Sequence, residues 1–166
     1  MISRLASSLL GFPSHCAGFH PFDPPEMERQ ASAVWNGTLR DGNGTMTAPS
    51  GVLHNASYTF GTRFEATPGT NPEELIAAAH AGCFSMAFSG KLTAAGFPPE
   101  RIATTATVTL EKTEAGFTIT AVHLKTTARV PGASAEVFAA EAESARQTCP
   151  VSRVLNTRIT LDATLE

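Results

Sequence analysis

The chain has 166 residues, of which 42% are hydrophobic and 16% charged, the composition of an ordinary globular domain. A net charge of −3 without a basic run excludes the electrostatic footprint of a nucleic-acid-binding protein. Because no apolar stretch approaches the roughly 18–20 residues of a membrane span, we expect a soluble protein outside the membrane. Three cysteines are too few for a secreted disulfide scaffold and indicate a reducing compartment, so we expect the cytoplasm.

The first 26 residues differ in composition from the rest of the chain. They are rich in Ser and Pro and show no regular hydrophobic period. The apolar run Leu5–Leu10 is interrupted by Ser7 and Ser8 and is too short for the core of a signal peptide, although targeting stays an alternative. We predict an N-terminal extension over residues 1–26, with Cys16 in it, and one domain over residues 27–166.

The domain is predicted to begin with a β-hairpin. Apolar and polar residues alternate over Ala33–Gly37, Arg40–Gly44 has the composition of a tight turn, and extended chain resumes at Thr45–Thr47. Further extended pieces are expected at Val52–Leu53 and Tyr58–Phe64, between Pro and Gly residues.

A long helix is predicted next. Thr70–Glu74 combines a capping Thr or Asn, a Pro at the first helical position and acids in the first turn. Apolar residues then recur at helical spacing until Ala95–Pro99 ends the run. Few charges lie between Glu74 and Lys91, so we expect this helix to be buried on most sides.

The last third of the chain is predicted to return to strands. Ala103–Lys112 and Phe117–Val130 alternate in the manner of a second hairpin, and Ser134–Gln147 has the pattern of an amphipathic helix. A short helical turn over Cys149–Leu155 and a final strand over Thr157–Leu165 complete the order. Strands and helices segregated in this way predict an α+β domain with a mostly antiparallel sheet.

Two cysteines within the domain are candidates for chemistry. Cys83 and Cys149 are 66 residues apart, so only the fold can bring them together, and small buried hydrophobe is the commoner role of a free cysteine. Cys149 lies at the start of a predicted helical turn, where the dipole favours a thiolate. Cys83 lies too far from its helix start for that effect, so a nucleophilic Cys83 requires a cation from elsewhere, with Arg40 and Arg153 as candidates.

Other constellations are weaker. His80 and Cys83 have the spacing of two metal ligands on one helix, but the sequence lacks the second pair that a zinc site requires. A Cys–His hydrolase lacks an orienting Asn or Asp, and the glycine-rich loops that bind nucleotide phosphates are missing.

Two segments of the chain resemble a known family. Residues 70–87 (TNPEELIAAAHAGCFSMA) and 149–155 (CPVSRVL) look like the two signature segments of the OsmC/Ohr family of thiol-dependent peroxidases, closest to the osmotically inducible OsmC branch. The likeness runs from about Ala31 to Leu165 and leaves out residues 1–26.

The resemblance implies an α+β intertwined homodimer with a long buried central helix and active sites at the subunit interface. It implies reduction of organic hydroperoxides to alcohols, with Cys83 as the peroxide-attacking cysteine and Cys149 as the resolving cysteine. Arg40 and Glu73 fall on the family's active-site Arg and Glu. The family uses an external dithiol, with lipoylated proteins known for the Ohr branch, and requires no metal, haem or flavin cofactor.

One expectation comes from helix geometry. Ten residues separate Glu73 from Cys83, or roughly 15 Å along a continuous helix, so the two cannot share a site within one chain. We therefore expect Glu73 to come from the partner subunit and to orient Arg40, with two copies of the helix running antiparallel across Ala78. The alternative function is a non-enzymatic module that binds a hydrophobic ligand at the same dimer interface, with inert cysteines.

Overall fold

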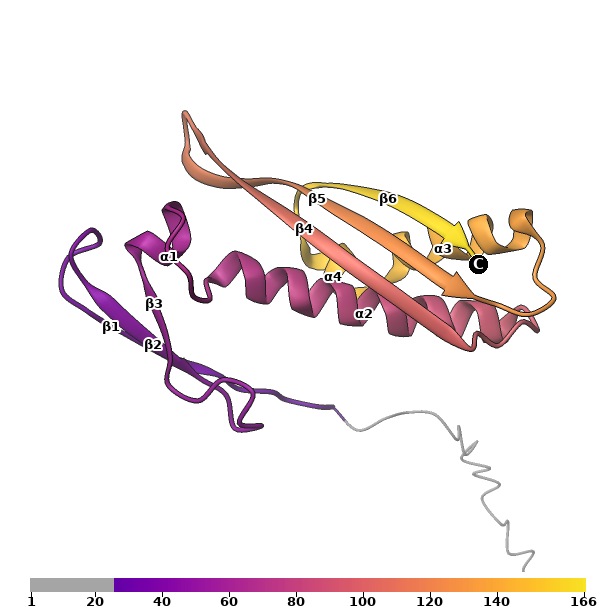
Figure 1. Ribbon diagram of the computed structural model, residues 1–166, viewed down its shortest axis with the longest axis horizontal. Helices are drawn as coiled ribbons and strands as arrows, with labels where there is room; N and C mark the ends of the chain where they lie inside the picture. The colour runs from indigo at the N-terminus through magenta and orange to yellow at the C-terminus, as the bar shows by residue number, and fades with distance from the viewer. Residues whose placement is uncertain (1–25) are drawn as a thin grey trace, which may run out of the picture. The chain divides into compact units, whose positions relative to one another are not determined.

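A computed structural model of the protein describes residues 26–166, and Ala31–Glu166 form one compact unit. The predicted N-terminal extension, with Cys16, lies outside the described residues apart from Glu26. The described unit contains two three-stranded sheets, β1-β2-β3 and β4-β5-β6, with the helices following between their strands in the chain (Figure 1). The prediction of an α+β domain is confirmed.

The first sheet contains the predicted hairpin. β1 (Ser32–Asn36) pairs antiparallel with β2 (Asn43–Thr47), which pairs antiparallel with β3 (Ala56–Thr59). Gly37, directly after β1, has a φ of 86°, a left-handed conformation that glycine adopts without strain and that turns the chain toward β2.

The prediction of extended chain over Tyr58–Phe64 is wrong in its second half. Phe60–Phe64 form a short helix, α1, because the two threonines Thr59 and Thr62 cap it reciprocally. The Thr62 N–H donates to the Thr59 hydroxyl at 3.2 Å, and the Thr59 N–H donates to the Thr62 hydroxyl at 2.9 Å. Each bond satisfies a backbone or hydroxyl group that a strand would leave without this partner.

The predicted long helix is α2 (Pro72–Ala94). The Asn71 side chain accepts a hydrogen bond from the Glu74 N–H at 2.9 Å and Pro72 occupies the first turn, as the sequence signals indicate. Gly96, with a φ of 90°, follows the C-terminal end.

One face of α2 is exposed in the chain, so the expected burial on most sides is wrong for the chain by itself. Phe84, Phe88 and Leu92 are fully buried, whereas Met86 is 78% exposed. Between Leu75 and Leu92 the exposed positions follow helical spacing and carry mostly small side chains: Ala78, Ala79, Gly82, Met86 and Gly90. By length and composition α2 could also span a membrane, a test that the core helix of a soluble protein passes equally.

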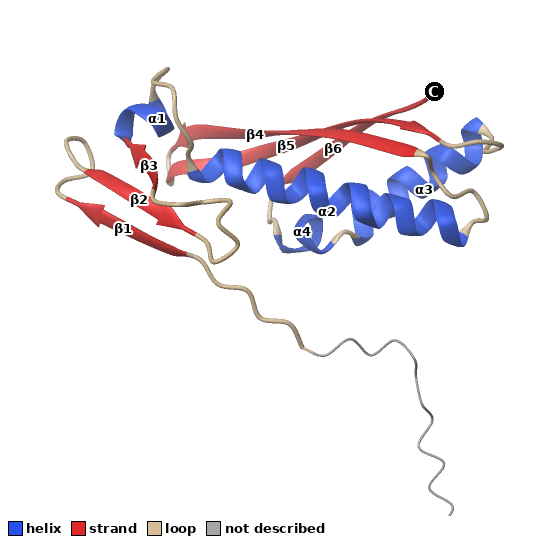
Figure 2. Cartoon of the chain, turned by 60° about the horizontal axis from the view of Figure 1, so that its bottom comes forward, coloured by secondary structure: helices blue, strands red, loops and turns tan. Residues whose placement is uncertain are grey.

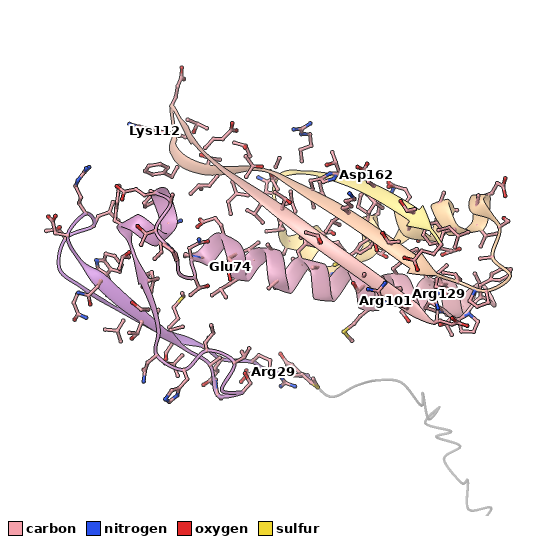
Figure 3. All side chains as sticks on the ribbon, in the orientation of Figure 1. Arg29, Glu74, Arg101, Lys112, Arg129 and Asp162 are labelled. Carbon is pink, nitrogen blue, oxygen red and sulfur yellow. The ribbon has the colours of Figure 1, made fainter. Side chains whose placement is uncertain are left out.

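The second sheet, β4-β5-β6, packs against the long helices of the chain. β4 (Arg101–Thr113) and β5 (Gly116–Arg129) form the predicted antiparallel hairpin, and α2, α3 and α4 lie along one side of the sheet (Figure 2). At one end of the hairpin Arg101 and Arg129 are direct cross-strand neighbours (Figure 3). Their guanidinium groups face the carboxylate of Glu166 at 4.0 and 3.9 Å, and the Glu166 N–H donates to the Ala128 carbonyl at 2.9 Å.

The last strand departs from the antiparallel pattern. β6 (Arg158–Leu165) pairs with β5 in parallel, and the crossover between them consists of α3 (Ala135–Thr148) and α4 (Pro150–Val154). The sheet is therefore mixed, with one antiparallel and one parallel pair. The two helices provide the long crossover that a parallel pair requires. The core lies between this sheet, α2 and α3, and it includes the following fully or almost fully buried residues: Phe84, Phe88, Leu92, Leu124, Ala128, Phe138, Ala142, Ala145 and Cys149.

Candidate active site

The structure brings the two predicted cysteines together. The Cys149 thiol lies 2.9 Å from the Cys83 sulfur, and both are free. Cys83 projects from the middle of α2, and Cys149 forms the joint between α3 and α4. The Cys149 N–H donates to Ala145 at the end of α3, and its carbonyl accepts from Arg153 in α4, at 2.9 and 3.0 Å. The helix joint thus holds the second sulfur directly against α2.

The surroundings of Cys83 within one chain disfavour its thiolate. Burial and the hydrogen bond with Cys149 raise the pKa of the Cys83 thiol above its ordinary value of 9.0, while a hydrogen bond from the Val151 backbone lowers it. Among the described residues of a single chain, no cation contributes to this pKa shift. A nucleophilic Cys83 therefore requires a positive charge that its own chain does not place beside it.

A bidentate ion pair lies at the N-terminal end of α2. Arg63, at the end of α1, donates through Nη2 to Glu73 Oε1 at 2.8 Å and through Nε to both carboxylate oxygens at 3.2 and 3.3 Å. The Glu73 side chain is only 11% exposed and that of Arg63 is 34% exposed. A planar guanidinium held by two oxygens at once is fixed in orientation, and such a group suits an active site.

Arg63 is the residue that sequence reasoning missed. Its local signal was the pair Thr59 and Thr62, whose reciprocal capping makes the turn of helix that aims Arg63 at Glu73. The predicted Arg40 lies against the first residue of the same helix, with its guanidinium carbon 5.4 Å from the centre of the Phe60 ring. Within the described chain Glu73 thus binds Arg63, and a catalytic role for Arg40 stays a prediction.

The Arg63–Glu73 ion pair and the two cysteines lie at different places along α2. α2 is continuous from Pro72 to Ala94, so the ten residues between Glu73 and Cys83 correspond to roughly 15 Å along its axis. The premise of the sequence argument therefore holds: one chain does not place Glu73 beside Cys83.

Arg63 lines an apolar pocket of about 370 Å³. Arg63 supplies a charged group in a lining that is otherwise largely aromatic or aliphatic. The other side chains that form the lining come from β1, β3, α1 and the loop between β1 and β2: Trp35, Leu39, Tyr58, Thr59, Phe60 and Phe64. A pocket of this size and chemistry suits a small apolar ligand.

Comparison with known proteins identifies the family. The family model described as OsmC-like protein matches residues 64–164, a range that begins directly after Arg63 and includes Glu73, Cys83 and Cys149. Peroxiredoxin OsmC of Escherichia coli strain K12 is 50% identical over 140 residues, which cover 84% of this chain and 98% of that protein. This chain belongs to the OsmC family. The resemblance seen in the two signature segments is thereby confirmed.

Solved structures show the OsmC fold in more distant relatives. An OsmC-like protein of unknown function from Vibrio cholerae has a TM-score of 0.66 at 17% identity and covers 83% of this chain and 99% of its own. The organic hydroperoxide resistance protein OhrB of Bacillus subtilis has a TM-score of 0.60 at 22% identity, with coverage of 82% and 98%. Both likenesses concern the fold.

His80, which the sequence offers with Cys83 as a pair of metal ligands, bonds to a serine in this OsmC chain. The His80 imidazole is fully buried, and its Nε2 lies 2.8 Å from the hydroxyl of Ser152 in α4. Over residues 26–166, no three His, Cys, Asp or Glu side chains gather in a way that could hold a metal ion.

Proposed function

We propose that this chain is a thiol-dependent peroxidase that reduces organic hydroperoxides to alcohols. The observation that carries the proposal is the 2.9 Å separation of the Cys83 and Cys149 sulfurs, which permits a disulfide after little movement. A 50% identical relative is named a peroxiredoxin, which supports a peroxidase role in general, and several structural relatives are named organic hydroperoxide resistance proteins.

The proposed cycle uses the two sulfurs in sequence. The Cys83 thiolate attacks the distal peroxide oxygen, the O–O bond breaks, and the alcohol leaves with a proton while Cys83 becomes a sulfenic acid. The Cys149 thiol then displaces the hydroxyl as water and forms the Cys83–Cys149 disulfide. An external dithiol, such as the lipoyl group of a protein, reduces the disulfide and is itself oxidised. The cycle requires no metal, haem or flavin, and we place it in the cytoplasm, where a reducing pool keeps thiols available.

A second copy of the chain supplies the missing cation in this proposal. Glu73 and Cys83 are equidistant in sequence from Ala78, so two α2 helices crossing antiparallel at Ala78 bring Glu73 of one copy to Cys83 of the other. The exposed small residues Ala78, Ala79 and Gly82 allow the close approach that such a crossing requires. The Arg63 guanidinium, held by Glu73, then stands in the role that the resemblance assigns to Arg40.

This arrangement accounts for two otherwise costly features of the single chain. It covers the exposed face of α2, and it sets a guanidinium against a thiol whose pKa the chain alone raises. It also brings the apolar pocket beside Arg63 to the same site, where it suits the organic tail of a hydroperoxide.

The same pocket favours one second candidate, a non-enzymatic module that binds a hydrophobic ligand. A peroxidase assay with reduced lipoamide and cumene hydroperoxide distinguishes the two. We expect turnover in the wild type, none in Cys83→Ser, and a single oxidation of Cys83 without disulfide in Cys149→Ser. Thiol titration before and after one equivalent of the hydroperoxide serves as the control. Unchanged thiols in the wild type would favour the binding module, and turnover retained in Cys83→Ser would refute the assignment of Cys83.

A further inference from the structure

A buried hydrogen bond joins the two helices that carry the cysteines. His80 of α2 is fully buried, and its Nε2 lies 2.8 Å from the Ser152 hydroxyl of α4, which is only 8% exposed. Such burial shields both groups from bulk water, which strengthens the bond electrostatically.

The bond lies one helical turn from each sulfur. His80 precedes Cys83 by three residues, and Ser152 follows Cys149 by three residues, so each polar group shares a helix face with a cysteine. α2 and α4 are therefore linked at two adjacent points, one by the sulfurs and one by the imidazole and the hydroxyl. The second link fixes the rotation and the height of α4 against α2, and with them the position of Cys149.

α4 depends on contacts of this kind. It has five residues, its N-cap makes no side-chain hydrogen bond, and Val154 at its end is 76% exposed. A single helical turn does not persist by itself in water. Among its apolar side chains, Val151 packs against the core. The Ser152 hydroxyl adds a hydrogen bond that holds this turn against α2.

The imidazole is an expensive group for a purely structural role. Burial lowers the pKa of His80, which keeps the ring neutral, and its Nδ1 atom has no hydrogen-bond partner among the described residues. An aliphatic side chain would fill the same space without a buried polar atom left over. What it would lack is the bond to Ser152.

We propose that His80 and Ser152 are positioning residues that hold the Cys149 sulfur against Cys83 and so direct the oxidised Cys83 toward the disulfide. The proposal rests on the proposed peroxidase function. The Cys83 sulfenic acid has two fates: the Cys149 thiol displaces its hydroxyl, forming the S–S bond and releasing water, or a second hydroperoxide transfers an oxygen to it, leaving a sulfinic acid and an alcohol. A loosened α4 slows the first reaction and leaves the second unchanged.

The test compares Ser152→Ala with Ser152→Thr, which keeps the hydroxyl, and His80→Leu with His80→Gln, whose amide nitrogen reaches about as far as Nε2. Ser85→Ala is the matched control, because Ser85 of α2 also donates a part-buried hydroxyl bond, but to Thr104 of β4, at 2.8 Å, and not to α4. Reduced protein is mixed with excess cumene hydroperoxide and quenched with dimedone, and the disulfide, sulfenic and sulfinic forms are counted by intact mass spectrometry.

We expect Ser152→Ala and His80→Leu to form the disulfide about tenfold more slowly and to accumulate sulfinic acid, with the rate of the first oxidation unchanged. The Thr, Gln and Ser85→Ala variants should behave as wild type. Equal disulfide rates and equal sulfinic fractions in wild type and Ser152→Ala would overturn the proposal.

A peroxide-free measurement separates this proposal from the proposed function. Equilibration in dithiothreitol redox buffers gives the potential of the Cys83–Cys149 disulfide, and a tenfold loss of effective concentration in Ser152→Ala raises it by about 30 mV. If Ser152→Ala shows this shift but the wild-type protein does not react with hydroperoxide, the peroxidase function is refuted and the positioning role stands. An unshifted potential would sink the positioning role whatever the peroxide result.

Discussion

Replacing Arg63 by Met tests which guanidinium activates Cys83. The substitution keeps most of the side-chain volume and removes the charge and the three contacts with Glu73 at 2.8–3.3 Å. The matched control is Arg40→Met, which removes the guanidinium that lies 5.4 Å from the Phe60 ring centre.

The magnitude comes from the ionisation of Cys83. A thiol with the ordinary pKa of 9.0 is about 1% thiolate at pH 7, and burial with the Cys149 hydrogen bond raises the pKa of Cys83, which lowers that fraction further. If the Arg63 guanidinium of a second copy keeps Cys83 ionised, its removal reduces the nucleophilic thiolate about 100-fold or more. The exposed contact of Arg40 with Phe60 is worth only about 0.5–1 kcal/mol, and its loss leaves the thiol unaffected.

The assay is the single-turnover rate of Cys83 oxidation by cumene hydroperoxide between pH 6 and 10, measured in a Cys149→Ser background. We expect Arg63→Met to move the rise of the rate to alkaline pH and to lower the rate at pH 7 about 100-fold, and Arg40→Met to retain the wild-type profile within about threefold. Arg63→Met with wild-type reactivity, or Arg40→Met with the larger loss, would refute the reasoning and return the role to Arg40.

Three further expectations concern the helix, the buried imidazole and the core. A Cβ at Gly82 meets no atom of the chain within 4 Å, so Gly82→Leu should preserve the folded chain but convert a dimer to monomers in sedimentation equilibrium; a dimer that persists would place the interface elsewhere. Because burial lowers the pKa of His80 below 6.5, the unfolded chain binds a proton there that the folded chain does not as the pH falls below about 6.5. Wild type should therefore lose more stability than His80→Gln between pH 7.5 and pH 5 in urea unfolding, and parallel losses would contradict a neutral buried His80. Phe88→Ala removes a fully buried ring that contacts Phe84 and Phe138, at about 3–5 kcal/mol in the same urea experiment; a cost below about 1 kcal/mol would show that the site collapses around the gap.

The parts of the fold that follow from local chemistry were predictable from the sequence. The start of α2 could be predicted because its first residues each satisfy a separate requirement of a helix N-terminus: Asn71, Pro72, Glu73 and Glu74. The hairpin β4–β5 and helix α3 were predicted from periodicity.

The parts that depend on other segments were not. α1 forms because Thr59 and Thr62 cap each other, a local device that an apolar count does not register. The parallel direction of β6 depends on the α3–α4 crossover, and an alternating pattern contains no strand direction. The exposed face of α2 could not be distinguished from a buried one, since Ala and Gly suit both surfaces.

The candidate site divided in the same way. The sequence singled out Cys83 and Cys149, and the fold brings their sulfurs to 2.9 Å. It did not indicate that Glu73 binds Arg63, because nothing in the sequence around an arginine shows which carboxylate its side chain will reach in the fold.

The late position of Cys149 in the chain has a consequence for biosynthesis. Cys83 leaves the ribosome 66 residues ahead of it, and α4 and β6 are made after α2. Cys83 therefore cannot pair with Cys149 until the α3–α4 crossover has docked against α2 and the sheet. Rapid pairing of these two sulfurs becomes a signature of completed maturation, and truncated or half-folded chains should lack it.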